Sequence, residues 1–348
     1  RPWDQQWSMR MQQIMAFETD LLEYEDLFDG NPTIEAKVAR LKDEARHELA
    51  SLDALGGAIE AIGYMKSRLV ESNTQRLNKI ASKETTVVGV NKFTTGEPSP
   101  LTAGDGGIMT VDPAVEQDQV DRLNAWRSGR DDASVAAALR SLRAAARAGE
   151  NIMPASIAAA KAGVTTGEWA AQMRLIYGEY RGPTGVAHGV SNQSEGLDEI
   201  RDAVDLVSQK LGRRLGFLMG KPGLDGHSNG AEQIAARARD CGMKIAYDGI
   251  RLTPEQLIAS VQEHKPHVIG LSILSGSHIP LVEDMMKRLQ LAQLDNIPVV
   301  VGGIIPQEDM IRLTAMGVAK IYTPKDFELN AIMMDIVSLA DPTDLAAE

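Results

Sequence analysis

The sequence has one cysteine, no long apolar run and no basic cluster beyond short pairs such as Arg213-Arg214. The single thiol, Cys241, excludes an internal disulfide framework and fits a reducing cytoplasm. No apolar run approaches the ~20 residues that span a bilayer, and no signal peptide is visible, so we expect a cytoplasmic protein without a membrane segment. The 36 basic residues against 48 acidic ones leave a net charge of −12. This balance disfavours a nucleic-acid partner.

The chain also lacks an initiator methionine and begins Arg1-Pro2-Trp3. We therefore expect it to be a processed or truncated piece of a longer polypeptide. Its 348 residues suffice for two domains, and the 43% apolar content is typical of a globular protein.

Residues 1–93 are expected to be helical, with one strand near their end. Apolar residues recur at helical spacing around 14–22, 35–52 and 65–80. The run Thr85-Thr-Val-Val-Gly-Val90 is rich in β-branched residues and predicts a strand. The acidic segment 23–30 lacks the carboxylate spacing of a calcium loop, so a solvated turn is the simpler interpretation.

Residues 94–194 read as a linker followed by helices. Glycine and proline crowd between 94 and 113, which is typical of a linker. Apolar residues then follow helical spacing, and Thr165-Thr-Gly-Glu168 matches a capping box that opens a further helix. A second punctuated stretch, Arg181 to Gly189, closes this connecting subdomain.

From Leu197 onward, short apolar runs alternate with helical patterns. We predict strands at 215–220, 243–247, 267–272, 298–301 and 320–322. Helices are predicted at 197–211, from about 228, and near 254–264, 279–292, 306–316 and 327–339. This alternation predicts an α/β fold, a doubly wound five-stranded parallel sheet with helices on both faces.

Three polar or glycine-rich motifs follow strands of this predicted sheet. Lys221-Pro-Gly-Leu-Asp-Gly-His-Ser-Asn-Gly230 follows the first strand, Ser272-Ile-Leu274 the third and Gly302-Gly303 the fourth. The carboxyl ends of parallel strands meet at one edge, where α/β folds hold ligands. Taken alone, His227 is better explained as a loop histidine whose polar groups are satisfied by the backbone. Together, the motifs predict a ligand site.

The series D-x-H-x-x-G, S-x-L and G-G resembles the cobalamin-binding domain of adenosylcobalamin-dependent mutases and of methionine synthase, a flavodoxin-like sheet. Upstream, Arg1-Pro-Trp-Asp-Gln-Gln-Trp-Ser8, Val88-Gly-Val-Asn-Lys92 and Gly96-Glu-Pro-Ser-Pro100 are similar to the large acyl-CoA mutases, nearest to the ethylmalonyl-CoA mutase group. The resemblance covers essentially the whole chain. It implies the end of a substrate-binding (β/α)8 barrel at 1–93, a linker and helical subdomain at 94–194, and a cobalamin-binding domain at 195–348.

The resemblance implies that His227 is the axial ligand of the cobalt, because a neutral imidazole whose other nitrogen donates to a carboxylate is a good metal ligand. Asp225 is the expected partner, and Lys221 is expected to steady it. Ser272 would hydrogen-bond the cofactor's buried base, and the glycines would let its nucleotide tail approach the backbone. The implied cofactor-binding residues are Lys221, Gly223, Asp225, Gly226, His227, Ser228, Asn229, Gly230, Ser272, Leu274, Gly302 and Gly303.

The implied activity is an adenosylcobalamin-dependent radical rearrangement of an acyl-CoA carbon skeleton, ethylmalonyl-CoA to methylsuccinyl-CoA. Most residues that grip the acyl-CoA substrate would lie outside this chain, so no catalytic residue is assigned. The alternative is a cobalamin-binding subunit or carrier that is inactive without a barrel-containing partner chain. A homodimer, or association with such a chain, is expected. Methyl transfer or cobalamin sensing shares the cofactor motif but leaves the first hundred residues unexplained.

Other candidates keep simpler interpretations. His278 would neighbour the corrin ring or serve a capping or surface role. His264 and His267 are expected at element ends, and Cys241 as a buried apolar side chain. Asp326 and Lys325 would touch the cofactor's edge or, as we prefer, cap the last helix.

Overall fold

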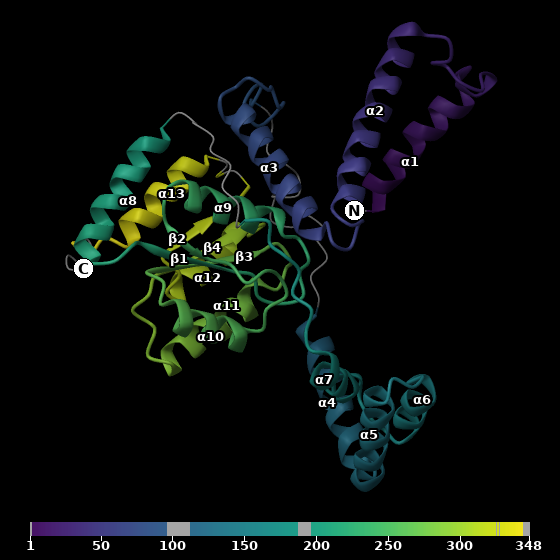
Figure 1. Ribbon diagram of the computed structural model, residues 1–348, viewed down its shortest axis with the longest axis vertical. Helices are drawn as coiled ribbons and strands as arrows, with labels where there is room; N and C mark the ends of the chain where they lie inside the picture. The colour runs from purple at the N-terminus through teal and green to yellow at the C-terminus, as the bar shows by residue number, and fades with distance from the viewer. Residues whose placement is uncertain (1, 96–111, 187–195, 325, 327, 344–348) are drawn as a thin grey trace. The chain divides into compact units, whose positions relative to one another are not determined.

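A computed structural model describes residues 2–95, 112–186, 196–324, 326 and 328–343 (Figure 1). The chain divides into two compact units. The smaller unit comprises Arg1–Gln5 and Ala103–Arg181, and the larger comprises Gln6–Thr102 and Gly182–Glu348. Gly96-Glu-Pro-Ser-Pro100 and most of the expected 94–113 linker lie outside the described residues. No helix among the described segments has the length and apolar character needed to cross a bilayer.

The smaller unit is a helical bundle of α4 (Pro113–Gly129), α5 (Asp132–Arg147), α6 (Met153–Lys161) and α7 (Thr166–Tyr177). The predicted capping box is confirmed, since Thr165 Oγ1 accepts from the Glu168 amide and Glu168 Oε2 accepts from the Thr165 amide. The same carboxylate receives two hydrogen bonds from the Arg130 guanidinium, at 2.6 and 2.7 Å. One side chain therefore caps α7 and ties it to the end of α4.

The larger unit begins at Gln6 within α1 (Pro2–Phe17) and continues with a short 3₁₀ turn (Leu21–Glu23), α2 (Pro32–Ala54) and α3 (Ile62–Ala81). The predicted strand at 85–90 is wrong. Gly89 has a φ of +77°, and a turn closes there with only an isolated bridge between Val88 and Lys92. The side chain of Asn91 bonds the backbone of Ile80, Thr85 and Val87. A side chain thus satisfies backbone groups that a neighbouring strand would otherwise pair.

Residues 197–339 form the predicted doubly wound α/β fold. The five parallel strands are β1 (Gly216–Gly220), β2 (Lys244–Ala246), β3 (Val268–Ile273), β4 (Val299–Gly303) and β5 (Lys320–Tyr322), in the order β2-β1-β3-β4-β5. The helices are α8 (Leu197–Leu211), α9 (Asn229–Asp240), α10 (Pro254–His264), α11 (His278–Leu291), α12 (Gln307–Ala315) and α13 (Leu329–Leu339).

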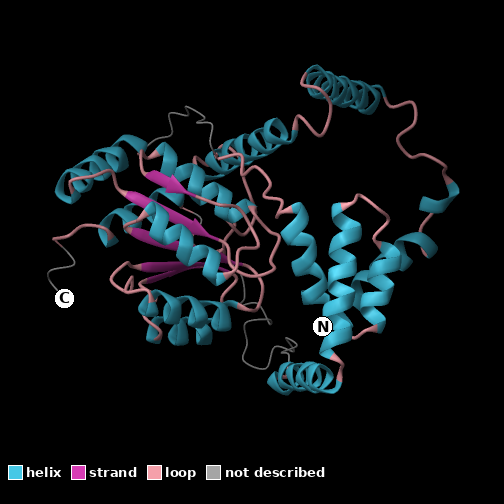
Figure 2. Ribbon diagram, turned by 60° about the horizontal axis from the view of Figure 1, so that its bottom comes forward, coloured by secondary structure: helices cyan, strands magenta, loops and turns pink. Residues whose placement is uncertain are grey.

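Helices cover both faces of the sheet, so β1 and β3 are buried at every position (Figure 2). Alternate residues of β1 point to opposite faces. Phe217 and Met219 pack with α8, α9 and α13, whereas Leu218 packs with α10, α11 and α12 (Figure 1). The outer strands β2 and β5 are three residues long, and each begins with an exposed lysine, Lys244 or Lys320.

Candidate functional site

The order of the sheet reverses between β1 and β3, because the chain leaves β1 toward β2 on one side and later returns to β3 on the other. Such a reversal opens a crevice at the carboxyl edge. β4 runs two residues farther than predicted, so Gly302 and Gly303 end the strand instead of following it. In the register of β3 and β4, Ser272 pairs with Gly302 and Ile273 with Gly303. The S-x-L and G-G motifs are therefore direct neighbours.

A buried ion pair joins the loop after β1 to the end of β3. Lys221 follows the last residue of β1 and is 0% exposed. Its Nζ lies 2.6 Å from Asp225 Oδ2 and 3.3 Å from the carbonyl oxygen of Ser272. The Asp225 side chain is only 4% exposed. Removing one partner of such a pair leaves a charge uncompensated in the interior, so the two residues depend on each other.

Asp225 also orients His227. Its Oδ1 accepts the His227 backbone amide at 3.0 Å and lies 2.6 Å from the ring nitrogen Nδ1. In the neutral ring this nitrogen carries the proton and donates, which leaves the lone pair on Nε2. The His227 side chain is 78% exposed. The loop thus presents an imidazole whose Nδ1 is held by Asp225 and whose other ring atoms are exposed.

The Asp225 carboxylate is stabilised as an anion. Burial alone would raise its pKa, but the ammonium of Lys221, the two N–H groups of His227 and the amide of Leu274 hold that pKa well below its ordinary range. The Leu274 amide donates to Oδ2 at 3.1 Å. Asp225 therefore joins the S-x-L segment to the histidine loop as a permanent acceptor.

The glycines of the three motifs have different surroundings. A Cβ at Gly302 or Gly230 would meet nothing within 4 Å, so both leave open space. A Cβ at Gly303 would lie 1.9 Å from the carbonyl oxygen of Ile273. Gly223 has a φ of +84°, and a Cβ there would be 2.8 Å from the Leu281 side chain. Gly303 and Gly223 are thus required by the fold itself.

The remaining predicted residues lie at the start of α9 and beside the crevice. Ser228 is the N-cap of α9 and Asn229 its first residue, and the Ser228 side chain makes no capping hydrogen bond. Ser272 is buried, and within the described chain its hydroxyl forms no hydrogen bond while its carbonyl binds Lys221. Gly226 lies against the guanidinium of Arg251, 3.2 Å from the position of a Cβ.

Three of the other histidines lie at the ends of helices or strands. His278 begins α11, is buried, and places Nε2 2.8 Å from Asp309 Oδ2, which excludes a surface role. His267 precedes β3 and accepts the Gly216 amide on Nδ1 at 2.8 Å; burial, aided by Arg213, lowers its pKa to about 4. His264 ends α10, as predicted.

Two further expectations have different outcomes. Cys241 is a free and fully buried thiol, and burial raises its pKa to about 11, which confirms an apolar role. The prediction that Asp326 caps the last helix is wrong, because Glu328 is the N-cap of α13. Asp326 instead accepts the backbone amide and hydroxyl of Thr323 and closes the turn after β5. Lys325 lies outside the described residues.

The sequence interpretation missed the loop after β2. Leu252 pairs with the first loop, since its amide donates to the Lys221 carbonyl and its own carbonyl accepts the Gly223 amide. The preceding Arg251 has a φ of +59°. Only the positive φ marks this residue as unusual, and the sequence carries no signal for it. The loop after β2 therefore supports the loop after β1 from the side.

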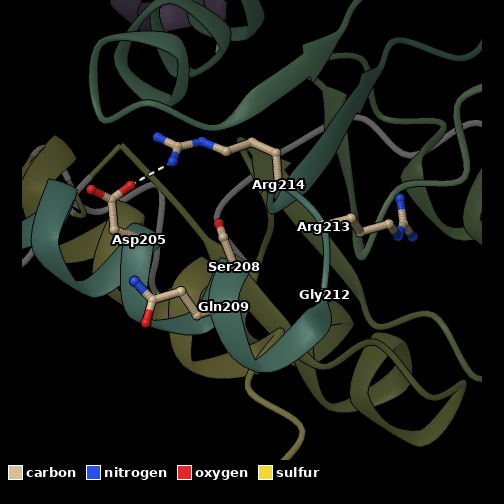
Figure 3. Close-up of a pocket in the computed structure, with 6 residues that line it drawn as sticks. All are labelled: Asp205, Ser208, Gln209, Gly212, Arg213 and Arg214. Carbon is tan, nitrogen blue, oxygen red and sulfur yellow. Dashed lines mark hydrogen bonds and ion pairs between the residues drawn. The ribbon is translucent and has the colours of Figure 1, made fainter.

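A surface hollow lies at the opposite edge of the sheet (Figure 3). It is lined by Asp205, Ser208, Gln209, Gly212, Arg213 and Arg214. These residues end α8 and precede β1, so they belong to the amino edge. Arg214 is paired there with Asp205. The hollow therefore lies away from the three motifs, which stand at the carboxyl edge.

Comparison with known proteins shows that two parts of the chain match protein families. The sequence model of methylmalonyl-CoA mutase matches residues 4–179, and that of the B12 binding domain matches residues 216–326. Ethylmalonyl-CoA mutase of Cereibacter sphaeroides is 68% identical over 348 residues, covering 100% of this chain and 53% of the relative. The protein of the same name from Methylorubrum extorquens is 56% identical, covering 98% of this chain and 50% of the relative.

A more distant relative, methylmalonyl-CoA mutase of Escherichia coli, is 30% identical over 94% of this chain and 46% of its own length. The chain thus spans about half the length of the curated relatives that it matches. The matched B12-binding segment contains β1 through β5 and all three motifs at the carboxyl edge.

Proposed function

The chain belongs to the methylmalonyl-CoA mutase family, and from that membership we propose that it forms the cobalamin-binding part of an adenosylcobalamin-dependent acyl-CoA mutase. The proposed reaction converts ethylmalonyl-CoA to methylsuccinyl-CoA. The choice of substrate is supported by identities of 68% and 56% to two ethylmalonyl-CoA mutases, against 30% to a methylmalonyl-CoA mutase. A free, buried cysteine is consistent with a cytoplasmic location.

The observation that carries the proposal is the arrangement of His227 on Asp225. We assign His227 Nε2 as the axial ligand of the cobalt, because Nδ1 is held by a carboxylate while the rest of the ring is exposed. Asp225 fixes the ring orientation and the tautomer. Lys221 keeps Asp225 ionised at working pH. The donor chemistry fits a metal that takes one neutral nitrogen from the protein.

The carboxyl edge of the sheet, where the S-x-L and G-G motifs lie side by side, suits the cofactor's nucleotide tail. Gly302 and Gly230 leave space where a side chain would otherwise stand, and the largely buried Ser272 offers a hydroxyl. Gly303 and Gly223 keep the backbone close-packed beside that space. The proposed cofactor-binding residues are Lys221, Gly223, Asp225, Gly226, His227, Ser228, Asn229, Gly230, Ser272, Leu274, Gly302 and Gly303.

When bound, adenosylcobalamin supplies a weak cobalt–carbon bond that generates the radical for the rearrangement. The residues of this chain bind the cofactor, orient it and enclose it. Asp225 holds the Nδ1 proton of His227, so that the ring presents its neutral nitrogen. The buried Lys221 and the apolar residues of β1 and β3 exclude water behind that loop.

The axial assignment is tested by the paramagnetic signal of cob(II)alamin bound to a chain labelled with the heavy nitrogen isotope. An axial protein nitrogen of this isotope splits the signal into doublets, whereas the cofactor's own unlabelled base gives triplets. We expect doublets for the native chain and their loss in His227→Ala. Doublets that persist in the variant, or triplets in the native chain, would contradict the assignment.

The alternative function is a cobalamin-binding subunit without activity of its own, supported by the separate match of residues 216–326 to the B12 binding domain. The two functions are separated by assaying ethylmalonyl-CoA turnover with adenosylcobalamin, first by this chain alone and then with the upstream half of a relative added. Turnover only in the mixture supports association with a barrel-containing chain. Turnover by this chain alone would refute the need for a partner other than a second copy.

A further inference from the structure

Helix α3 makes buried polar contacts with the first turn of α9. Lys66 Nζ of α3 lies 2.6 Å from Glu232 Oε1 of α9, and the Glu232 side chain is 5% exposed. Farther along α3, the buried Thr74 hydroxyl shares its proton between the Val70 carbonyl at 2.8 Å and Gln233 Oε1 at 3.0 Å. The Gln233 amide group in turn donates to the Val70 carbonyl at 3.3 Å. Neighbouring residues of α9 are thus fixed by a helix far upstream in the chain.

Because these groups are largely buried, losing the partner of any one of them is costly to stability. An acidic residue in the first turn of a helix is favoured by the helix dipole, but a buried carboxylate also needs a partner. Lys66 is the partner that Glu232 has. Gln233 is buried and uses both ends of its amide on α3. Loss of either partner leaves a polar group unsatisfied in the interior, which costs more than the bond itself contributes.

The anchored turn adjoins the candidate metal ligand. Helix α9 begins at Asn229, two residues after His227, and Glu232 accordingly lies in the turn that continues directly from the histidine loop. The loop is held by Asp225 at one end. Its other end continues into the first turn of α9, which is held by the polar contacts with α3 and by the packing of Ala231 in the core.

From these contacts we propose that Lys66 and Thr74 are positioning residues for His227, acting through Glu232 and Gln233. The inference rests on the proposed role of His227 and deepens it. It makes α3, which lies in the segment matched to methylmalonyl-CoA mutase, a working part of the site in the B12-binding segment. Ligation then depends on a helix outside the cofactor domain.

The test uses the whole chain and cob(II)alamin, with the variants Lys66→Met and Thr74→Val. Removing a group that hydrogen-bonds a metal ligand commonly weakens affinity by roughly 10–100-fold. Lys66 acts on His227 only through Glu232 and the first turn of α9, so we expect Lys66→Met to weaken cobalamin binding by roughly 10-fold, the lower end of that range, and to diminish the nitrogen doublets of the labelled chain. Thr74→Val keeps the side-chain volume and should give a smaller change in the same direction. Lys210→Met is the matched control, since Lys210 also forms a 2.6 Å ion pair, with Asp341, at the end of α8.

The outcomes separate this inference from the proposed function. If the native chain shows doublets and both α3 variants retain native affinity and doublets, α3 has no positioning role although His227 remains the ligand. If the native chain shows none, both proposals fall. If Lys210→Met weakens cobalamin binding as much as Lys66→Met does, the effect reflects general destabilisation and not positioning by α3. Circular dichroism of each variant verifies folding, and the milder Thr74→Val keeps the test decisive if Lys66→Met does not fold.

Discussion

Gly302 and Gly303 are adjacent in sequence, yet their surroundings are opposite. A Cβ at Gly303 would overlap the Ile273 carbonyl, whereas a Cβ at Gly302 would meet nothing. Gly303→Ala should therefore destabilise the protein by about 2 kcal/mol or more, through strain in a packed region. Gly302→Ala should leave the free energy of unfolding within about 0.5 kcal/mol of the native value but weaken cobalamin binding. Urea unfolding and cofactor titration measure the two effects, and an equal loss of stability in both variants would contradict this distinction.

Asp225 has two roles, and substitutions can separate them. Asp225→Asn leaves the fully buried Lys221 without its anion, and breaking a buried pair typically costs about 3–5 kcal/mol. The variant should also lose cobalamin affinity, because Nδ1 of His227 no longer faces a carboxylate. The double variant Lys221→Met with Asp225→Asn should recover much of the stability but none of the affinity. Denaturation and binding assays test this, and recovery of affinity would show that Asp225 acts only through Lys221.

Much of the candidate site follows from local spacing. Lysine, aspartate and histidine at 221, 225 and 227 in a loop after a strand predict neighbours, and the structure brings all three into hydrogen-bonding contact. Arg251 and the loop after β2 were not predictable in this way. Their proximity depends on how two loops pack, and nothing in either loop encodes the other.

At the scale of elements, strands buried on both faces were the most predictable. The five predicted strands are confirmed to within two residues at each end, since a continuous apolar run between two helical patterns is typical of a strand covered on both faces. The run at 85–90 shows why the same reasoning fails elsewhere. Val88 is 73% exposed, so the β-branched residues of this run do not belong to a buried strand. Propensity without a partner strand does not make a sheet.

The Arg130–Glu168 pair gives the helical unit a dependence on pH. The hydrogen bond from Arg130 lowers the pKa of Glu168 from 4.5 to about 2, and burial opposes this shift only in part. A lowered acid pKa contributes stability that is present above the unfolded value and is lost as pH falls toward the folded one. Glu168→Gln should lower the Tm at neutral pH, and its difference from the native chain should shrink between pH 4.5 and about 2. A pH-independent difference in Tm would contradict this assignment.

At the scale of the whole molecule, the pairing of α3 with α9 had no signature in the sequence. The two partners of the Lys66–Glu232 bond are 166 residues apart. Their residue types are those of ordinary solvated helix faces, and only tertiary packing buries them. The division into two compact units has the same origin, since it is decided by which surfaces meet.

Two compact units predict unfolding in more than one step. In scanning calorimetry of the whole chain, Gly303→Ala should lower only the transition of the unit that contains the sheet. Glu168→Gln should lower only that of the helical unit. One transition shifted by both variants would show that the units unfold as a single cooperative body.

The three-residue outer strands have a consequence for solubility. Each free edge of a sheet can pair with the edge of another molecule, and such pairing starts aggregation. β2 and β5 are too short to pair over many residues, and each begins with a lysine. If the same strand of a second copy were added at that edge, the two lysines would repel each other. Lys320 also binds Asp335 at 2.6 Å, which holds its charge beside β5. The same sheet that gathers the cofactor motifs at one edge is thereby protected along its sides from pairing with its own copies.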